Sequence, residues 1–192
     1  MRARDNPFRT ERILQVRYRL SEAGWNELLS RFEAARYRGA LVGPRGSGKT
    51  TLLEDLEHRL RARGFGTRLL RLNEEEPALD LRFLARLCQA LTARDILLLD
   101  GAEQMNWFAW RSFLWRTRSA AGLLITTHQH GRLPTVWECR TSCELLVGIA
   151  ADLLGTRSMG LRRQAEALFT RHRGNLRDAL REWYDLFAAA PG

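Results

Sequence analysis

The chain has 192 residues, 45% of them hydrophobic and 28% charged, which is long enough for one good core and typical of a soluble globular protein. No apolar run approaches the roughly 20 residues that a membrane-spanning helix needs, and no apolar segment follows the basic N-terminus as in a secretory signal. We therefore expect a cytoplasmic protein with no membrane span. The net charge of +9 predicts a polyanionic partner such as nucleic acid, although solvated arginine-rich helix faces would give the same total.

The three cysteines, Cys88, Cys139 and Cys143, are odd in number and form no C-x-x-C pair. We interpret them as reduced thiols of a cytoplasmic protein. Their spacing relative to the histidines does not match a zinc site, so the sequence favours no metal at these positions.

The first predicted elements lead to a glycine-rich loop. Residues 1–20 read as a basic arm, and a helix begins after Ser21, a plausible N-cap, and runs to about Tyr37. Its apolar face consists of Trp25, Leu28, Leu29 and Phe32. Ala40-Leu41-Val42 then reads as a buried strand.

The loop after this strand matches G-x-x-x-x-G-K-[ST] at every fixed position, with an amphipathic helix behind it. Such a loop turns successive backbone N–H groups toward a phosphate, and the helix N-terminus adds its dipole. Lys49, the only lysine in the chain, is expected to reach the β- and γ-phosphates of ATP, and the Thr50 hydroxyl to bind Mg²⁺. The predicted nucleotide-binding residues are Gly43, Pro44, Arg45, Gly46, Ser47, Gly48, Lys49, Thr50 and Thr51.

A second strand is expected over 67–72, followed by an acidic loop at 73–77 and a helix over 79–91. Ile96-Leu97-Leu98-Leu99-Asp100 reads as a buried parallel strand with an acid at its carboxyl end. Ligands of open α/β sheets bind at this edge, so the sequence predicts that Asp100 is the Walker B residue and helps Thr50 to hold Mg²⁺.

Residues 107–118 predict a helix in which aromatic side chains alternate with arginines. One side must pack on the sheet. The remainder is open to several interpretations: plain core packing, a protein-partner or homo-oligomer surface, a nucleic-acid stacking surface, or an interfacial membrane face.

The rest of the chain predicts two more strands and then helices only. We expect a strand over 122–128, a loop and short helix over 131–137, a fifth strand over 143–147, and helices over 149–154, 158–172 and 176–189. The predicted fold class is an α/β P-loop NTPase: a five-stranded, mainly parallel sheet sandwiched by helices, with a small C-terminal helical lid. The expected domains are a basic arm (1–20), the NTPase core (21–148) and the lid (149–192).

This order of motifs resembles that of AAA+ ATPases, and within them the compact ExeA and TniB/TnsC type. Three stretches carry the resemblance: Trp25 to Leu53, Leu98 to Gln104, and Gly174 to Leu180. It implies that Thr127 (or Thr126) is the sensor 1 residue and Arg177 the sensor 2 residue. It also implies that Arg140, just before the expected fifth strand, is an arginine finger acting on the nucleotide of a neighbouring subunit.

The sequence departs from this family in one place. The family usually carries a catalytic glutamate directly after the Walker B aspartate, where this chain has Gly101. Glu103 lies just beyond and is the alternative for positioning water. The sequence thus predicts an ATPase, or a slower nucleotide switch, coupled to a nucleic-acid or protein partner. The alternatives are a small-molecule or nucleotide kinase, a nucleotide phosphatase, and a non-hydrolysing adaptor.

Overall fold

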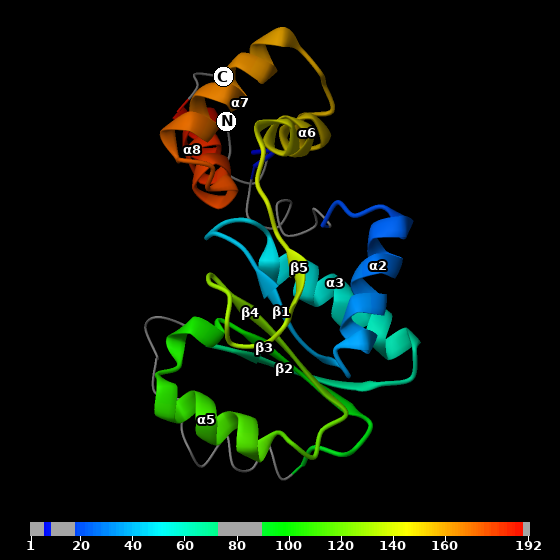
Figure 1. The fold of residues 1–192 in the computed structure, drawn as a ribbon. Helices are drawn as coiled ribbons and strands as arrows, with labels where there is room; N and C mark the ends of the chain where they lie inside the picture. The colour runs from blue at the N-terminus through cyan, green and yellow to red at the C-terminus, as the bar shows by residue number, and fades with distance from the viewer. Residues whose placement is uncertain (1–5, 9–17, 73–89, 190–192) are drawn as a thin grey trace. The chain divides into compact units, whose positions relative to one another are not determined.

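The computed structural model describes residues 6–8, 18–72 and 90–189 (Figure 1). The chain divides into two compact units. The sheet unit comprises Arg19–Gly43 and Lys49–Glu138. The helical unit comprises Met1–Tyr18, Pro44–Gly48 and Cys139–Gly192. The predicted acidic loop and nearly all of the helix over 79–91 lie outside the described residues, as does most of the N-terminal arm.

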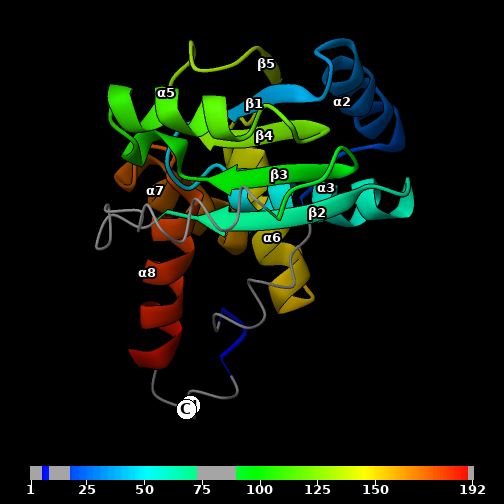
Figure 2. The same ribbon diagram turned by 90° about the horizontal axis from the view of Figure 1, so that it is seen from below.

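The sheet unit is built on five parallel strands in the order β2-β3-β4-β1-β5 (Figure 2). The strands are β1 (Arg38–Val42), β2 (Gly66–Arg71), β3 (Asp95–Asp100), β4 (Gly122–Thr127) and β5 (Thr135–Glu138). All six residues of β4 are buried, as expected for a parallel strand with both faces covered. The predicted fold class, a parallel five-stranded sheet with flanking helices, is confirmed.

Helices cover the sheet on both sides, with α5 (Trp107–Arg116) on one and α3 (Lys49–Ala62) on the other (Figures 1 and 2). The buried residues Trp110 and Phe113 of α5 share one apolar cluster with alternate residues of three strands, namely Ala40, Val42, Leu97, Leu99, Leu123 and Ile125. Strand side chains point alternately to the two faces, so the intervening residues face α3. The helix α2 (Glu22–Ala34) follows Ser21, whose hydroxyl accepts from Gly24 N as an N-cap.

The helical unit contains α6 (Cys143–Leu154), α7 (Met159–Arg171) and α8 (Leu176–Ala189). Its core includes the fully buried Trp183 of α8, on which the Phe8 ring stacks at 5.1 Å between centroids. Ser142 and Ser158 cap α6 and α7 by accepting from Leu145 N and Leu161 N, at 3.1 Å each.

The prediction of a fifth strand over 143–147 is wrong, because these residues form the first turns of α6. The buried side chains of α6 recur with helical spacing, as Leu146, Ile149, Ala150 and Leu153. The fifth strand is instead β5, whose residues were expected to form a loop and short helix. Within the described ranges, no helix is both long and apolar enough to cross a membrane.

Candidate nucleotide-binding site

The glycine-rich loop takes the tight backbone path that its sequence predicts. Gly46 and Gly48 have φ angles of 76° and 82°, a left-handed region that residues with a Cβ rarely adopt. Ser47 N donates to Pro44 O across the turn. The Ser47 hydroxyl is buried and has no hydrogen-bond partner among the described residues. Leaving such a group unpaired is costly, so the loop fits a ligand that brings a polar atom to it.

Lys49 occupies the first position of α3, where the loop becomes a helix. Its side chain is buried, and its ammonium group donates to the Gly43 carbonyl at 2.8 Å. A buried ammonium needs anionic or carbonyl partners. The Lys49 charge is thus held at the start of the glycine-rich loop.

Two threonine side chains of the sheet unit meet at the Asp100 carboxylate. The Thr50 hydroxyl donates to Asp100 Oδ2 at 2.9 Å, and the Thr126 hydroxyl donates to Asp100 Oδ1 at 2.5 Å. Gly101 N donates to the Thr126 hydroxyl oxygen at 2.8 Å, which fixes the threonine in turn. A hydroxyl and a carboxylate side by side are oxygen donors of the kind that Mg²⁺ binds.

The register of the sheet explains why Thr126 reaches Asp100. Leu99 of β3 lies opposite Ile125 of β4, so the next residues of the two strands, Asp100 and Thr126, are neighbours as well. Leu99 and Ile125 point to the α5 side, so Asp100 and Thr126 point to the α3 side, where Thr50 lies in the first turn of α3.

Thr127, the other sensor 1 candidate, is also buried but belongs to the opposite face of β4. Its hydroxyl donates to Gln129 O at 3.2 Å and accepts from Gln129 N at 3.4 Å. The structure therefore brings Thr126, not Thr127, onto the Asp100 carboxylate.

Glu103 lies in the short helix η2 (Ala102–Gln104), directly after β3. One carboxylate oxygen is 3.3 Å from Nε2 of His128, and the other is buried with no partner among the described residues. Burial lowers the pKa of the neighbouring Arg132, while the Glu103 charge acts in the opposite direction. The sequence alone predicts no role for His128, and only its position just after β4 points to the site.

The backbone at Gly101 explains why no glutamate follows Asp100. Gly101 has a φ of 85°, and a Cβ built there would lie 2.9 Å from the backbone oxygen of Leu72. Any residue larger than glycine would be strained by its φ and would press on the chain after β2. The first glutamate that this turn accommodates is Glu103.

The remaining candidates belong to the helical unit. Arg177 is exposed in the first turn of α8. The preceding Asn175 accepts from Asp178 N at 3.2 Å, and a Cβ at Gly46 would lie only 1.9 Å from its Oδ1. Arg140 is exposed between β5 and α6. In the part of the chain that the structure describes, no three His, Cys, Asp or Glu residues group together to hold a metal ion.

Solved structures similar to this chain include RuvB of Thermotoga maritima, described as a Holliday junction branch migration motor. The TM-score is 0.57 at 21% identity, over 88% of this chain and 63% of that one. A lysine-to-arginine variant of RuvB matches with a TM-score of 0.55 at 21% identity, over 81% of this chain and 58% of that one. The chain has a RuvB-like P-loop NTPase fold.

Sequence comparison adds a shorter match. A stretch of 72 residues is 40% identical to ABC transporter G family member 1 of Dictyostelium discoideum, covering 36% of this chain and 9% of that protein. No protein-family model matches the chain. The chain thus spans less than two thirds of the length of these relatives, 63% for RuvB and 9% for the transporter.

Proposed function

We propose that this chain is an AAA+-like ATPase that binds Mg-ATP at the glycine-rich loop. The observation that carries the proposal is the contact of the Thr50 hydroxyl with Asp100 at 2.9 Å. It joins the end of the P-loop to the end of the Walker B strand, two elements that are distant in sequence. The unpaired Ser47 hydroxyl and the buried Lys49 complete a set of groups suited to a triphosphate.

Each part of the site has a distinct role in this proposal. Residues 43–51 hold the phosphates through backbone N–H groups, and Lys49 adds a compact positive charge. Thr50 and Asp100 would hold Mg²⁺. When bound, the ion would neutralise negative charge on the phosphate oxygens. Thr126 orients Asp100 and is the better sensor 1 candidate by its contact.

Hydrolysis requires a group that orients the attacking water, and we assign this role to Glu103. The support is its carboxylate oxygen, buried and unpaired among the described residues, beside the Walker B strand. Because Glu103 sits beyond the usual position, a slow nucleotide switch is the second candidate function, and Gly101 is the observation that favours it.

We further propose that the helices after β5 act as the lid, with Arg177 as sensor 2 and Arg140 as an arginine finger in a homo-oligomer. The closer relation to the ExeA and TniB/TnsC type, the cytoplasmic location, and coupling to a nucleic-acid or protein partner belong to the same proposal. An arginine finger is typically worth a factor of ~10³ or more in rate. Arg140→Ala would then abolish turnover only where subunits assemble.

The decisive experiment measures ATP affinity by equilibrium titration and phosphate release with Mg²⁺, for the wild type and for Lys49→Ala. The proposal expects binding and turnover that Lys49→Ala removes while the melting temperature shows a folded protein. Lys49→Arg is the matched control, because it keeps the charge but not the compact ammonium group. Absence of ATP binding by the wild type, or unchanged affinity in Lys49→Ala, would overturn the proposal.

A further inference from the structure

The outer face of α5 exposes large aromatic side chains. Trp107, Phe108 and Trp115 are 65%, 77% and 61% exposed, whereas Trp110 and Phe113 on the inner face are buried. Isolated exposed apolar residues are ordinary, but three large rings on one helix of ten residues form a patch. The inner face of α5 already covers the sheet, so the exposed rings on its outer face are available to a partner.

The stretch of sequence that carries these rings is rich in arginine. Between Gln104 and Trp137 the sequence has four arginines, Arg111, Arg116, Arg118 and Arg132, and no aspartate or glutamate. A stretch of this composition attracts a polyanion, and Glu103, whose charge acts on Arg132, lies just outside it. Charge complementarity therefore selects a negatively charged partner.

The arginines and rings are paired in space. The guanidinium of Arg118 lies 4.8 Å from the ring centroid of Trp115, and that of Arg111 lies 6.0 Å from Trp107. A guanidinium over a ring keeps its N–H edges free to pair with phosphate oxygens in a bidentate way. The same face thus presents flat π surfaces and phosphate-binding groups next to each other.

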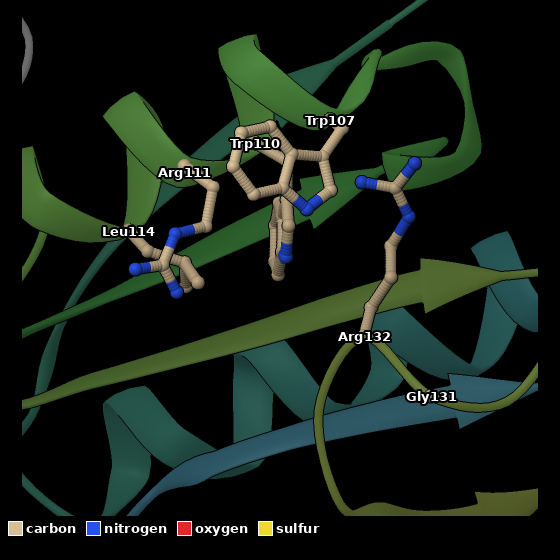
Figure 3. A pocket seen from close by; sticks show the side chains of 6 residues that line it. All are labelled: Trp107, Trp110, Arg111, Leu114, Gly131 and Arg132. Carbon is tan, nitrogen blue, oxygen red and sulfur yellow. The ribbon is translucent and has the colours of Figure 1, made fainter.

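A hollow of about 400 Å³ adjoins this face, between α5 and the loop after β4 (Figure 3). Figure 3 shows the Arg132 side chain reaching from that loop toward the indole rings of Trp107 and Trp110. Its position is fixed, because it donates to Met105 O at 2.6 Å and lies 5.1 Å from the Trp110 ring centroid. The hollow therefore has an aromatic wall and a cationic wall.

We propose that the outer face of α5 and the adjoining hollow form a binding site for single-stranded nucleic acid. Unpaired bases stack on Trp107, Phe108 and Trp115, and the arginines pair with the phosphates between them. A duplex fits less well, because its base faces are hidden inside the stack. A membrane surface fits less well too, because Arg111 lies among the rings of the apolar face and not along its border.

The test is the fluorescence anisotropy of a labelled single-stranded oligonucleotide of mixed sequence, titrated with the full chain at low salt. Removing the stacking rings in Trp107→Ala/Trp115→Ala is expected to weaken affinity by roughly 10-fold or more. Arg111→Ala/Arg118→Ala is expected to reduce the slope of log affinity against log salt by about 1.4, which is ~0.7 for each lost phosphate contact. All replaced residues are exposed, so melting temperatures should match the wild type.

The matched controls are Met159→Ala and Arg163→Ala on α7, an exposed apolar residue and an exposed arginine outside this face, which should leave binding unchanged. Equal binding by the ring variants, or duplex DNA bound as tightly as the single strand, would overturn the proposal. So would binding only to an acidic protein or to anionic vesicles. Lys49→Ala without ATP should bind the oligonucleotide like the wild type, so this site can stand even if the proposed ATPase activity fails.

Discussion

The Thr126 hydroxyl donates a hydrogen bond of 2.5 Å to Asp100, the carboxylate that ends the neighbouring strand. The same oxygen accepts from Gly101 N, so one side chain fixes both Asp100 and the turn that follows it. Thr127 is chemically identical and one residue away, yet its hydroxyl bonds to the backbone of Gln129. The two threonines thus allow the site to be tested with two nearly identical substitutions.

We expect Thr126→Val to impair the site and Thr127→Val to leave it largely intact. The first change keeps the shape but leaves Asp100 Oδ1 and Gly101 N without their partner, a cost of about 1–3 kcal/mol. Phosphate release should fall and the melting temperature should drop in Thr126→Val. Equal turnover in the two variants would show that the contact with Asp100 does not matter for activity.

We expect Glu103→Gln to bind ATP as the wild type does but to lose turnover. The amide cannot act as a general base, whose contribution is typically ~10²–10⁴-fold in rate. Affinity from titration and single-turnover phosphate release separate the two effects. His128→Ala should lower turnover by a smaller factor, because it removes the partner 3.3 Å from the carboxylate.

The matched control for His128 is His130→Ala. His130 is an exposed histidine two residues further on that contacts Thr135 and Glu138 instead. The His130→Ala variant should leave turnover unchanged. Wild-type turnover in Glu103→Gln would remove Glu103 from the mechanism and leave the nucleotide switch as the better description.

Placing a glutamate at the position usual in AAA+ proteins is expected to fail here. Gly101→Glu forces a Cβ into a φ of 85° and to within 2.9 Å of Leu72 O. The conformation alone costs about 1–2 kcal/mol. Gly101→Ala should lower the melting temperature about as much as Gly101→Glu, since both add the Cβ. A Gly101→Glu variant that is as stable as the wild type and hydrolyses ATP faster would contradict this explanation.

Much of the fold could be predicted because its central strands are easily recognised as aliphatic runs in the sequence. Ile96 to Asp100 and Gly122 to Thr127 are aliphatic runs with polar ends, as buried parallel strands require. The short edge strand β5 has no such run and follows Pro134, so its sequence resembles a loop. The run at 143–147 resembles a strand, and only the capping Ser142 and the buried residues beyond it reveal a helix.

The site residues that belong to a sequence motif could be predicted. The contacts that depend on how strands and turns lie beside one another could not. Thr50 and Asp100 follow from the P-loop and Walker B patterns, and the structure joins them. The choice between Thr126 and Thr127 depends on the register of β3 against β4, which the sequence of either strand does not contain. The contact between Glu103 and His128 likewise depends on two turns that meet only after the sheet has formed.

Gly46→Ala is expected to disturb the P-loop more than its backbone angle alone would. A Cβ there meets Asn175 Oδ1 at 1.9 Å and Arg177 N at 3.2 Å, and moving Asn175 would break the hydrogen bond that its Oδ1 accepts from Asp178 N. Gly64→Ala is the matched control, because Gly64 has a similar φ of 87° but nothing within 4 Å of the added atom. The melting temperature and ATP affinity should both fall further in Gly46→Ala.

Adding Asn175→Ala to Gly46→Ala tests the cause of this difference. Removing the side chain that the new methyl group meets should make the double variant more stable than the sum of the single effects predicts, because the two positions are in contact. Strict additivity would show that the loss comes from the backbone of Gly46 alone.

Glu182 should make the stability of the helical unit depend on pH. Its carboxylate lies 2.6 Å from His172 Nε2 and also pairs with Arg171, so it ties α8 to the end of α7. The hydrogen bond from His172, followed by the charge of Arg171, lowers the pKa of Glu182 below its ordinary value of 4.5. Because its pKa is lower in the folded state, the ionised Glu182 contributes fully to stability above pH 4.5. This contribution is lost as the pH falls through the lowered pKa of the folded protein. Glu182→Gln should therefore melt at a lower temperature than the wild type at neutral pH, and the difference should shrink in acid.

Glu166→Gln provides the control for this measurement. Glu166 also pairs with an arginine, Arg162 at 3.0 Å, but both groups lie on the surface of α7 and only four residues apart. Exposed pairs of this kind contribute little, so its melting temperature should follow the wild type at every pH. A gap between Glu182→Gln and the wild type that stays constant into acid would show that Glu182 acts through packing and not through its charge.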